Sequence, residues 1–166
     1  MMPQLYYPTI IGLFSLQASD QYLERVTIMP PAMKKPEKQD LAAILKQSSL
    51  LKEVVAQIEA YFTGKVFSFD LPLQPAKTAR GEAIRQALCQ IPYGETASYR
   101  QLAMKAESGA RAIGQACARN PLALIVPCHR IIKADGSLGQ YSAGEGITTK
   151  AWLIDHERLH RGSFSL

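Results

Sequence analysis

A cysteine and a histidine stand side by side in the segment Ile125–Ile132, which reads IVPCHRII. Cysteine attacks as its thiolate, and a free thiol with a pKa of about 8.5 is mostly protonated at neutral pH. A reactive cysteine therefore needs a base or a cation nearby, and His129 and Arg130 follow Cys128 directly. Neighbours along a chain need not touch in space, and most buried cysteines only fill a core. The pair predicts a nucleophile only if other residues of the chain support it.

Four more segments carry residue types that could serve such a nucleophile. They combine small residues, which leave room for a substrate, with single polar side chains that can hold or move a proton. In chain order the segments are IPYGETASYRQL at 91–102, GARAIGQACARNP at 109–121, GQYSAG at 139–144 and KAWLIDHE at 150–157. All of them lie in the second half of the chain, so the elements of that half must bring them together.

The positive charge of the chain also lies in its second half. The 166 residues include 19 Lys and Arg and 14 Asp and Glu, which gives a net charge of +5. Residues 1–75 hold seven of each kind, so residues 76–166 hold 12 basic and seven acidic residues. A content of 47% hydrophobic and 20% charged residues is typical of a folded protein. A polyanion would be expected to dock on the carboxy-terminal part, although many basic proteins never bind nucleic acid.

Cysteine and histidine usage limits the other kinds of site. Cys89, Cys117 and Cys128 have no paired spacing, which argues against a disulfide framework or a CxxC zinc site and favours a reducing compartment. We assign Cys89 and Cys117 to packing and expect no metal. The chain start lacks a signal-peptide pattern, and no segment approaches the roughly 18 apolar residues of a membrane span. We expect a cytoplasmic protein, nuclear in a eukaryote, that is not secreted and has no membrane partner.

Residues 1–75 predict a small structural domain of antiparallel strands and one helix. The helix begins at a candidate cap, Ser49, and ends at Gly64, because apolar residues between them recur at helical spacing. These apolar residues are Leu51, Val54, Val55, Ile58 and Phe62. The other expected elements are strands at 12–17, 22–29 and 66–71, a hairpin turn at 18–20, an exposed loop at 29–40 and a linker at 72–78.

Residues 76–166 predict a second, mostly helical domain, so the chain as a whole is α+β. Ala83, Ile84, Ala87 and Leu88 share one face of a helix. A capping box, Ser98-x-x-Gln101, begins a short helix that reaches about Lys105, and a second helix spans about 110–119. Such a pair with a glycine-containing turn is typical of a helix-turn-helix, although a purely structural helical hairpin has the same pattern.

The five segments, in this order and spacing, resemble the O6-alkylguanine–DNA alkyltransferases, a family of direct-reversal DNA-repair proteins. The resemblance covers roughly residues 80–160 and is looser before them. It implies a methyltransferase that acts once, because it moves the alkyl group from O6-alkylguanine, flipped out of duplex DNA, to its own cysteine. It also implies a winged helix-turn-helix with an active-site loop, double-stranded DNA as partner, no cofactor and a monomer. Some members hold a zinc in the amino-terminal domain, but residues 1–75 contain no Cys or His.

The resemblance gives each polar side chain of the expected site a role. Cys128 would be the nucleophile, and His129 would take its proton through a water molecule. Glu157 would orient His129 and stabilise its positive charge, as the third member of such arrangements does. Asn120 would hold the loop or the proton network around the cysteine. Tyr99 would donate its phenolic proton toward guanine N3 as the base departs.

The resemblance also predicts which residues meet the DNA. Small residues such as Ala110 and Gly114 let the second helix approach the minor groove, where sequence is read poorly, so little sequence preference is expected. Arg111 would fill the gap left by the extruded nucleotide, since a planar guanidinium can stack between bases. Arg130 and Tyr99 complete the expected DNA contacts.

A guanine pocket is expected from the segment after the cysteine. Gly139, Ser142 and Ala143 would leave room for a flat ring, and Tyr141 would form a wall. Main-chain groups of Cys128, Ile131 and Ser142 would recognise the base.

Two other classes of protein remain open at this point. The first is a lesion-binding relative that keeps the fold but replaces the nucleophile, and Cys128 argues against it. The second is a cysteine hydrolase built on Cys128, His129 and Glu157, which would also need an oxyanion hole and an acyl substrate. The sequence signals neither of these two requirements.

Overall fold

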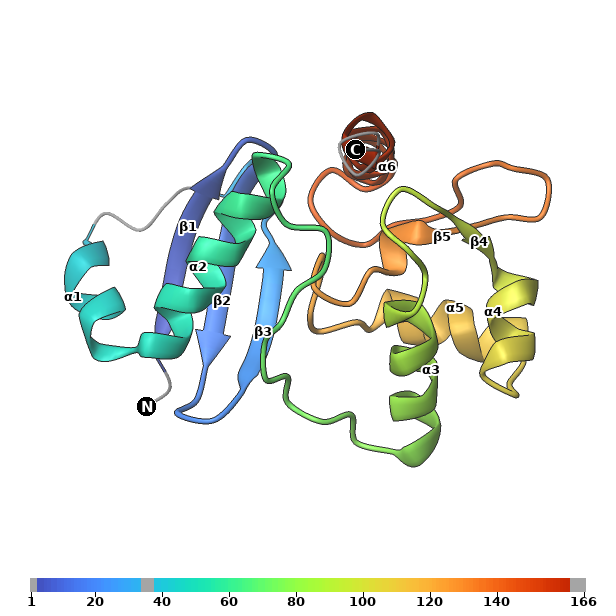
Figure 1. Ribbon diagram of the computed structural model, residues 1–166, viewed down its shortest axis with the longest axis horizontal. Coiled ribbons are helices and arrows are strands. Elements are labelled where there is room, and N and C mark those ends of the chain that lie inside the picture. The colour runs from blue at the N-terminus through green and yellow to red at the C-terminus, as the bar shows by residue number, and fades with distance from the viewer. Residues whose placement is uncertain (1–2, 34–37, 162–166) are drawn as a thin grey trace. The chain divides into compact units, whose positions relative to one another are not determined.

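A computed structural model gives the three-dimensional structure of the chain and describes residues 3–33 and 38–161 (Figure 1). The chain forms two compact units. The first runs through Gln74 and also takes in Pro121–Ile125, which the sequence places in the carboxy-terminal part. The second comprises Pro75–Asn120 and the residues from Val126 onward. The predicted α+β class is confirmed, with an antiparallel sheet in the first unit and mostly helices in the second.

The first unit is built on a three-stranded antiparallel sheet in the order β1–β2–β3. β2 (Gly12–Ala18) and β3 (Leu23–Ile28) are the predicted hairpin, and the register pairs Phe14 with Ile28. β1 (Gln4–Thr9) was missing from the sequence-based expectation. Only Leu5 of β1 is buried, so the alternation of apolar and polar residues that identifies a strand is too weak there.

Two helices follow the sheet in the chain. α1 (Leu41–Gln47) was not predicted and begins where the carboxylate of Asp40 accepts from the Ala43 N–H at 3.0 Å. α2 (Ser49–Phe62) packs on β1 and β2 (Figure 1) through a buried face that includes the predicted Leu51, Val54 and Ile58. The cap is Ser48 and not Ser49, because the Ser48 hydroxyl accepts from the Leu51 N–H at 3.1 Å. Of the loop expected at 29–40, residues 34–37 lie outside the described residues.

The strand predicted at 66–71 is wrong. Its alternating apolar residues serve a helix and not a sheet, since the ring of Phe69 stacks on Tyr61 of α2 at 5.5 Å between centroids. The Gln57 side chain also bonds both main-chain groups of Asp70, accepting from its N–H and donating to its carbonyl at 2.9 Å each. A side chain thus provides the hydrogen bonds that a neighbouring strand would have made. Residues 66–71 form no β-bridge, and a bridge to Leu23 occurs only beyond them, at Leu73.

The second unit contains the helices expected from residue 79 onward. α3 (Ala79–Cys89) buries Ile84, Ala87 and Leu88 but leaves Ala83 exposed. α4 (Tyr99–Lys105) and α5 (Ala110–Ala118) pack together as the predicted helix-turn-helix. The remaining elements are the parallel strand pair β4 (Ala97–Ser98) and β5 (Ile131–Ile132), the single-turn 3₁₀ helix η1 (Cys128–Arg130) and the helix α6 (Ile147–Arg161). Among the described residues, no helix is both long and apolar enough to cross a membrane.

The predicted capping box fixes the start of α4. The Ser98 hydroxyl accepts from the Gln101 N–H at 3.0 Å, and the Gln101 side chain accepts from the Ser98 N–H at 2.8 Å. Ser98 also ends β4, which pairs with β5 directly after η1. The box therefore fixes the junction between β4 and α4, and β4 is the partner of the strand that follows the cysteine turn.

We expect Ser98→Ala to lower the free energy of unfolding by about 1 kcal/mol, because the substitution removes the acceptor for the Gln101 N–H. Urea unfolding at pH 7 measures the change. The control is Ser68→Ala, since Ser68 is exposed and lies outside every helix and strand. Equal stability of the two variants would contradict a stabilising role for the box.

Candidate active site

The cysteine lies on a tight turn between a buried segment and a strand. Pro127 precedes η1 with φ of −82°, and the turn is closed by the Arg130 N–H, which donates to the Pro127 carbonyl at 3.0 Å. The chain then enters β5, where Ile131 pairs with Ala97. Because all three residues of η1 are buried, the sequence CHR places its side chains inside the unit and not on its surface.

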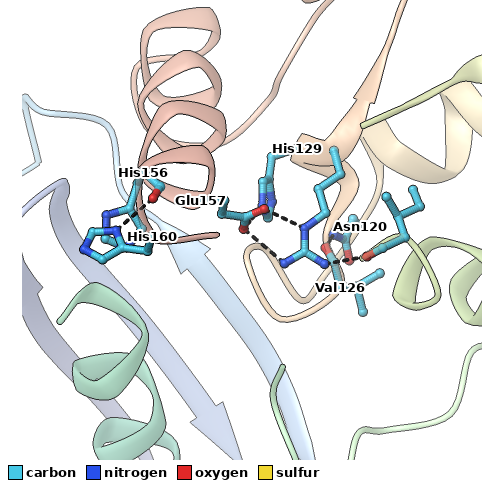
Figure 2. A network of polar contacts seen from close by, with 8 residues as sticks. Asn120, Val126, His129, His156, Glu157 and His160 are labelled. Atoms are coloured by element: carbon cyan, nitrogen blue, oxygen red, sulfur yellow. Dashed lines mark hydrogen bonds and ion pairs between the residues drawn. The ribbon is translucent and has the colours of Figure 1, made fainter. Parts of the chain in front are cut away.

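Glu157 joins α6 to this turn through two neighbouring residues (Figure 2). Its Oε2 lies 2.7 Å from His129 Nε2, and its Oε1 accepts from Arg130 Nε at 2.7 Å. Arg130 Nη2 also donates to Oε2 at 3.1 Å, so the guanidinium grips the carboxylate with two donors. The His129 side chain is fully buried, and that of Glu157 is only 2% exposed. One buried carboxylate therefore holds both a histidine and an arginine.

These contacts influence the protonation states of Glu157 and His129. Burial opposes the charged form of Glu157, but His129 and Arg130 outweigh it and hold the pKa of the carboxyl well below its usual range. Burial lowers the pKa of His129, and the nearby Glu157 only partly offsets this. A neutral His129 donates its Nε2–H to Glu157, which leaves Nδ1 as the acceptor. Nδ1 is buried and has no hydrogen-bond partner in the part of the chain that the structure describes, so it is free to take a proton.

The Cys128 sulfur is surrounded by groups that favour its anion. The hydrogen bond from the Cys117 thiol lowers the pKa of Cys128 most, burial opposes it, and Asn120 and Lys150 lower the pKa further. Asn120 Nδ2 donates to the sulfur at 3.3 Å. It also donates to the carbonyl of Val126 at 3.0 Å (Figure 2). The amide thus ties the sulfur to the main chain just before it. The structure gives Cys128 the lowered pKa that a nucleophilic thiol needs.

Two members of this cluster were not assigned to the site from the sequence. Cys117, expected only to pack, donates to Cys128, and this hydrogen bond together with burial raises the pKa of Cys117. Lys150 is fully buried in the first turn of α6. A signal for Lys150 existed, because it stands seven residues before Glu157 and so on the same face of a helix. No sequence signal marks Cys117.

Two tyrosines lie beside the thiols. Burial raises the pKa of Tyr99, and the nearby Cys117 and Cys128 raise it further, so its phenol stays a proton donor. Gly139 lies beside Tyr99, since a Cβ built on it would be 3.5 Å from the Tyr99 Oη, and its φ of +74° favours glycine. Burial raises the pKa of Tyr141 well above its ordinary value. Its Oη is buried without a hydrogen-bond partner among the described residues.

The other residues expected to line the pocket have varied environments. Ser142 is exposed, and its hydroxyl lies 3.5 Å from the carbonyl of Ala118. Ala143 is half-buried and accepts from the Gly146 N–H at 3.0 Å. Ile131 is fully buried, and its N–H donates to the carbonyl of Cys128, so its side chain belongs to the core.

One face of α5 is open and nearly free of bulk. Ala110 and Arg111 are exposed in its first turn. A Cβ built on Gly114 meets no atom within 4 Å, so this glycine leaves open surface and not a crowded packing contact. Another molecule could approach the helix backbone closely here, and Arg111 would be the cation at its edge.

Arg130 is a correction to the sequence-based expectation. It was expected to contact DNA, but it is buried, and Nη1 donates to the carbonyl of Ile91 at 2.8 Å in addition to the contacts with Glu157. Its guanidinium also lies 5.7 Å from the ring centroid of Tyr93. Because its donors are used inside the unit, Arg130 supports the site and does not reach a DNA phosphate.

Comparison with protein families gives two adjoining matches. The model described as "6-O-methylguanine DNA methyltransferase, DNA binding domain" matches residues 80–159. The model described as "6-O-methylguanine DNA methyltransferase, ribonuclease-like domain" matches residues 5–75. Among the described residues, no group of three or more His, Cys, Asp and Glu could hold a metal ion.

Individual proteins agree with the family matches. A methylated-DNA–protein-cysteine methyltransferase of Methanosarcina barkeri is 44% identical over 68% of this chain and 72% of its own length. That of Methanosarcina acetivorans is 39% identical over 89% of this chain and 92% of its own. A crystal structure of Mycobacterium tuberculosis OGT in complex with DNA is similar with a TM-score of 0.78 and 32% identity, covering 93% of this chain and 92% of that one.

We expect Glu157→Gln to lower the free energy of unfolding by about 3 kcal/mol or more at pH 7, because it leaves the Arg130 charge buried without its carboxylate. Urea unfolding followed by circular dichroism measures the loss. The matched control is Asp155→Asn on the exposed side of α6, which should cost less than about 0.5 kcal/mol. A similar loss in both variants would show that Glu157 is not the link between α6 and the turn.

Proposed function

The chain belongs to the 6-O-methylguanine DNA methyltransferase family and is a DNA-repair methyltransferase, and we propose that Cys128 is the residue that takes the alkyl group. The substrate of this proposal is O6-alkylguanine in duplex DNA. The observation that carries it is the environment of the Cys128 sulfur. Asn120 and Cys117 donate to the sulfur, and the neighbouring His129 has a free proton-accepting nitrogen.

The reaction forms one bond to sulfur and breaks one bond to oxygen. The Cys128 thiol gives its proton to the relay of His129 and Glu157, through a water molecule to Nδ1. The thiolate attacks the alkyl carbon in line, and the bond from that carbon to guanine O6 breaks. The electron pair leaves with the guanine, which takes a proton at N3 that the Tyr99 phenol supplies. The products are guanine and an S-alkylcysteine.

DNA docks through the open face of α5 in this proposal. Its small side chains let the helix lie in the minor groove, and the nucleotide is flipped out to bring the O6 substituent to Cys128. Arg111 occupies the space that the base leaves. The exposure of Ala110 and Arg111 and the open surface at Gly114 support this arrangement. A reader of the minor groove needs little sequence preference, which suits a protein that must find damage in any sequence.

The protein acts once and as a monomer in this proposal. A thioether has no good leaving group, so water cannot readily restore the thiol. Neither alternative class is favoured. The lesion-binding relatives lack the nucleophile, and the curated relatives are named for methyl transfer to a protein cysteine and not for hydrolysis.

We expect Cys128→Ser to abolish methyl transfer while the protein still binds DNA, because a hydroxyl resembles a thiol in size but is far less acidic. Mass spectrometry after mixing with a methylated duplex measures the transfer, with Cys89→Ser as the control that stays active. The parent should gain one methyl group on Cys128. No gain would indicate a lesion binder, repeated turnover would indicate a hydrolase, and residual transfer by Cys128→Ser within about tenfold of the parent would mean a different nucleophile.

We expect Arg111→Ala to slow repair of duplex DNA more than reaction with the free modified base, because only the duplex requires a base to be flipped out. Second-order rates on the two substrates measure the difference. The control is Arg158→Ala, which removes the same charge from an exposed site on α6. Equal losses on both substrates would contradict the role of Arg111 in base flipping.

A further inference from the structure

A lysine lies buried near the proposed nucleophile, and no step of the proposed reaction uses it. Lys150 is 0% exposed and stands in the first turn of α6. Within the described residues, the single hydrogen bond of its ammonium group goes from Nζ to the main-chain carbonyl of Gln140, at 3.3 Å. A buried ammonium with one neutral acceptor is costly unless an anion lies close to it.

The geometry of α6 shows which anion is available. Lys150 and Glu157 share the buried face of the helix and stand two turns apart, or about 10 Å along its axis. The helix packs on η1 through this face, and Glu157 there meets His129 and Arg130. Glu157 is therefore already neutralised by Arg130. Burial lowers the pKa of Lys150, whereas Cys128, the other residue of the turn, and Cys117 raise it and so favour the ammonium.

With Lys150 protonated, the charges buried around η1 balance when Cys128 is a thiolate and its proton has left the cluster. Arg130 and Glu157 cancel, and burial lowers the pKa of His129, which keeps it neutral. With a neutral thiol at Cys128, the positive charge of Lys150 is left over, whereas a thiolate cancels it. The other titratable groups that interact with Cys128 are Cys117, Tyr99 and Tyr141. Their pKa values are all raised, so they stay neutral and supply no competing anion.

We propose that Lys150 is the counter-ion of the Cys128 thiolate and holds the nucleophile in its anionic form before the substrate arrives. It is a positioning residue that acts through the sulfur. The inference rests on the proposed function only in that Cys128 is the nucleophile. The alternative is a purely structural lysine that fastens the loop at Gln140.

Two substitutions of the same residue separate charge from hydrogen bonding. Lys150→Gln keeps a donor for the Gln140 carbonyl but has no charge, whereas Lys150→Arg keeps the charge. Lys105→Gln removes a charge from the exposed end of α4 and is the matched control. The first measurement is the rate at which iodoacetamide modifies Cys128, followed from pH 5 to 10 by mass spectrometry of the peptide that contains it. The second is the rate of methyl transfer from a methylated duplex over the same range.

We expect the inflection of the modification rate to move up by at least about one pH unit in Lys150→Gln, because an opposite charge nearby typically shifts a pKa by this much or more. At pH values below both inflections the Lys150→Gln variant should react about tenfold more slowly than the parent, and near pH 10 the two rates should converge. The methyl-transfer rate should follow the same pattern. Lys150→Arg and Lys105→Gln should keep the inflection of the parent.

Three results would overturn the inference. The first is a Lys150→Gln profile with the inflection of the parent. The second is a loss by the same factor at every pH, which indicates a structural role. The third is a Lys150→Arg variant that keeps the parent's circular dichroism and unfolding midpoint but reacts like Lys150→Gln. Failure of the proposed function is distinguishable, because the parent would then transfer no methyl group although iodoacetamide still reports on its thiol.

Discussion

A single buried carboxylate, that of Glu157, determines how the rest of the site is arranged. It binds His129 and Arg130, which are neighbours on one turn, so α6 can sit on that turn in only one way. The contact sets the histidine tautomer, because Nε2 donates to the carboxylate and Nδ1 remains free. It also draws Arg130 into the interior. The free Nδ1 of His129, which accepts the proton in the proposed reaction, and the burial of Arg130 thus both follow from the contacts with Glu157.

Local sequence signals predicted the structure correctly where the interacting residues lie close together in the sequence. The Ser98–Gln101 box needs only residues within one turn of α4, and it forms as expected. The segment 66–71 alternates like a strand, but its hydrogen bonds and its aromatic contact come from Gln57 and Tyr61 on α2. Residues that are distant in sequence decided its conformation, and a pattern within six residues contains no information about them.

The site shows the same division between residue type and environment. The cysteine, the histidine and the glutamate could be picked out by type, order and spacing, and the structure brings His129 and Glu157 into contact. The sequence did not predict that the basic residue Arg130 is buried. The residue types at 129 and 130 do not show whether the arginine contacts DNA or a carboxylate. In the structure, Arg130 contacts the carboxylate of Glu157. The roles of Cys117 and Lys150 likewise follow only from their interactions with Cys128.

The charge balance of the cluster changes when the proposed reaction takes place. In the proposed state, the Cys128 thiolate and the buried Lys150 ammonium form a neutral pair in the interior of the unit. Alkylation converts the sulfur into an uncharged thioether, so Lys150 would lose its anion in the same step that repairs the base. Because water cannot readily restore the thiol from a thioether, the ion pair of Cys128 and Lys150 is used once in the proposed reaction.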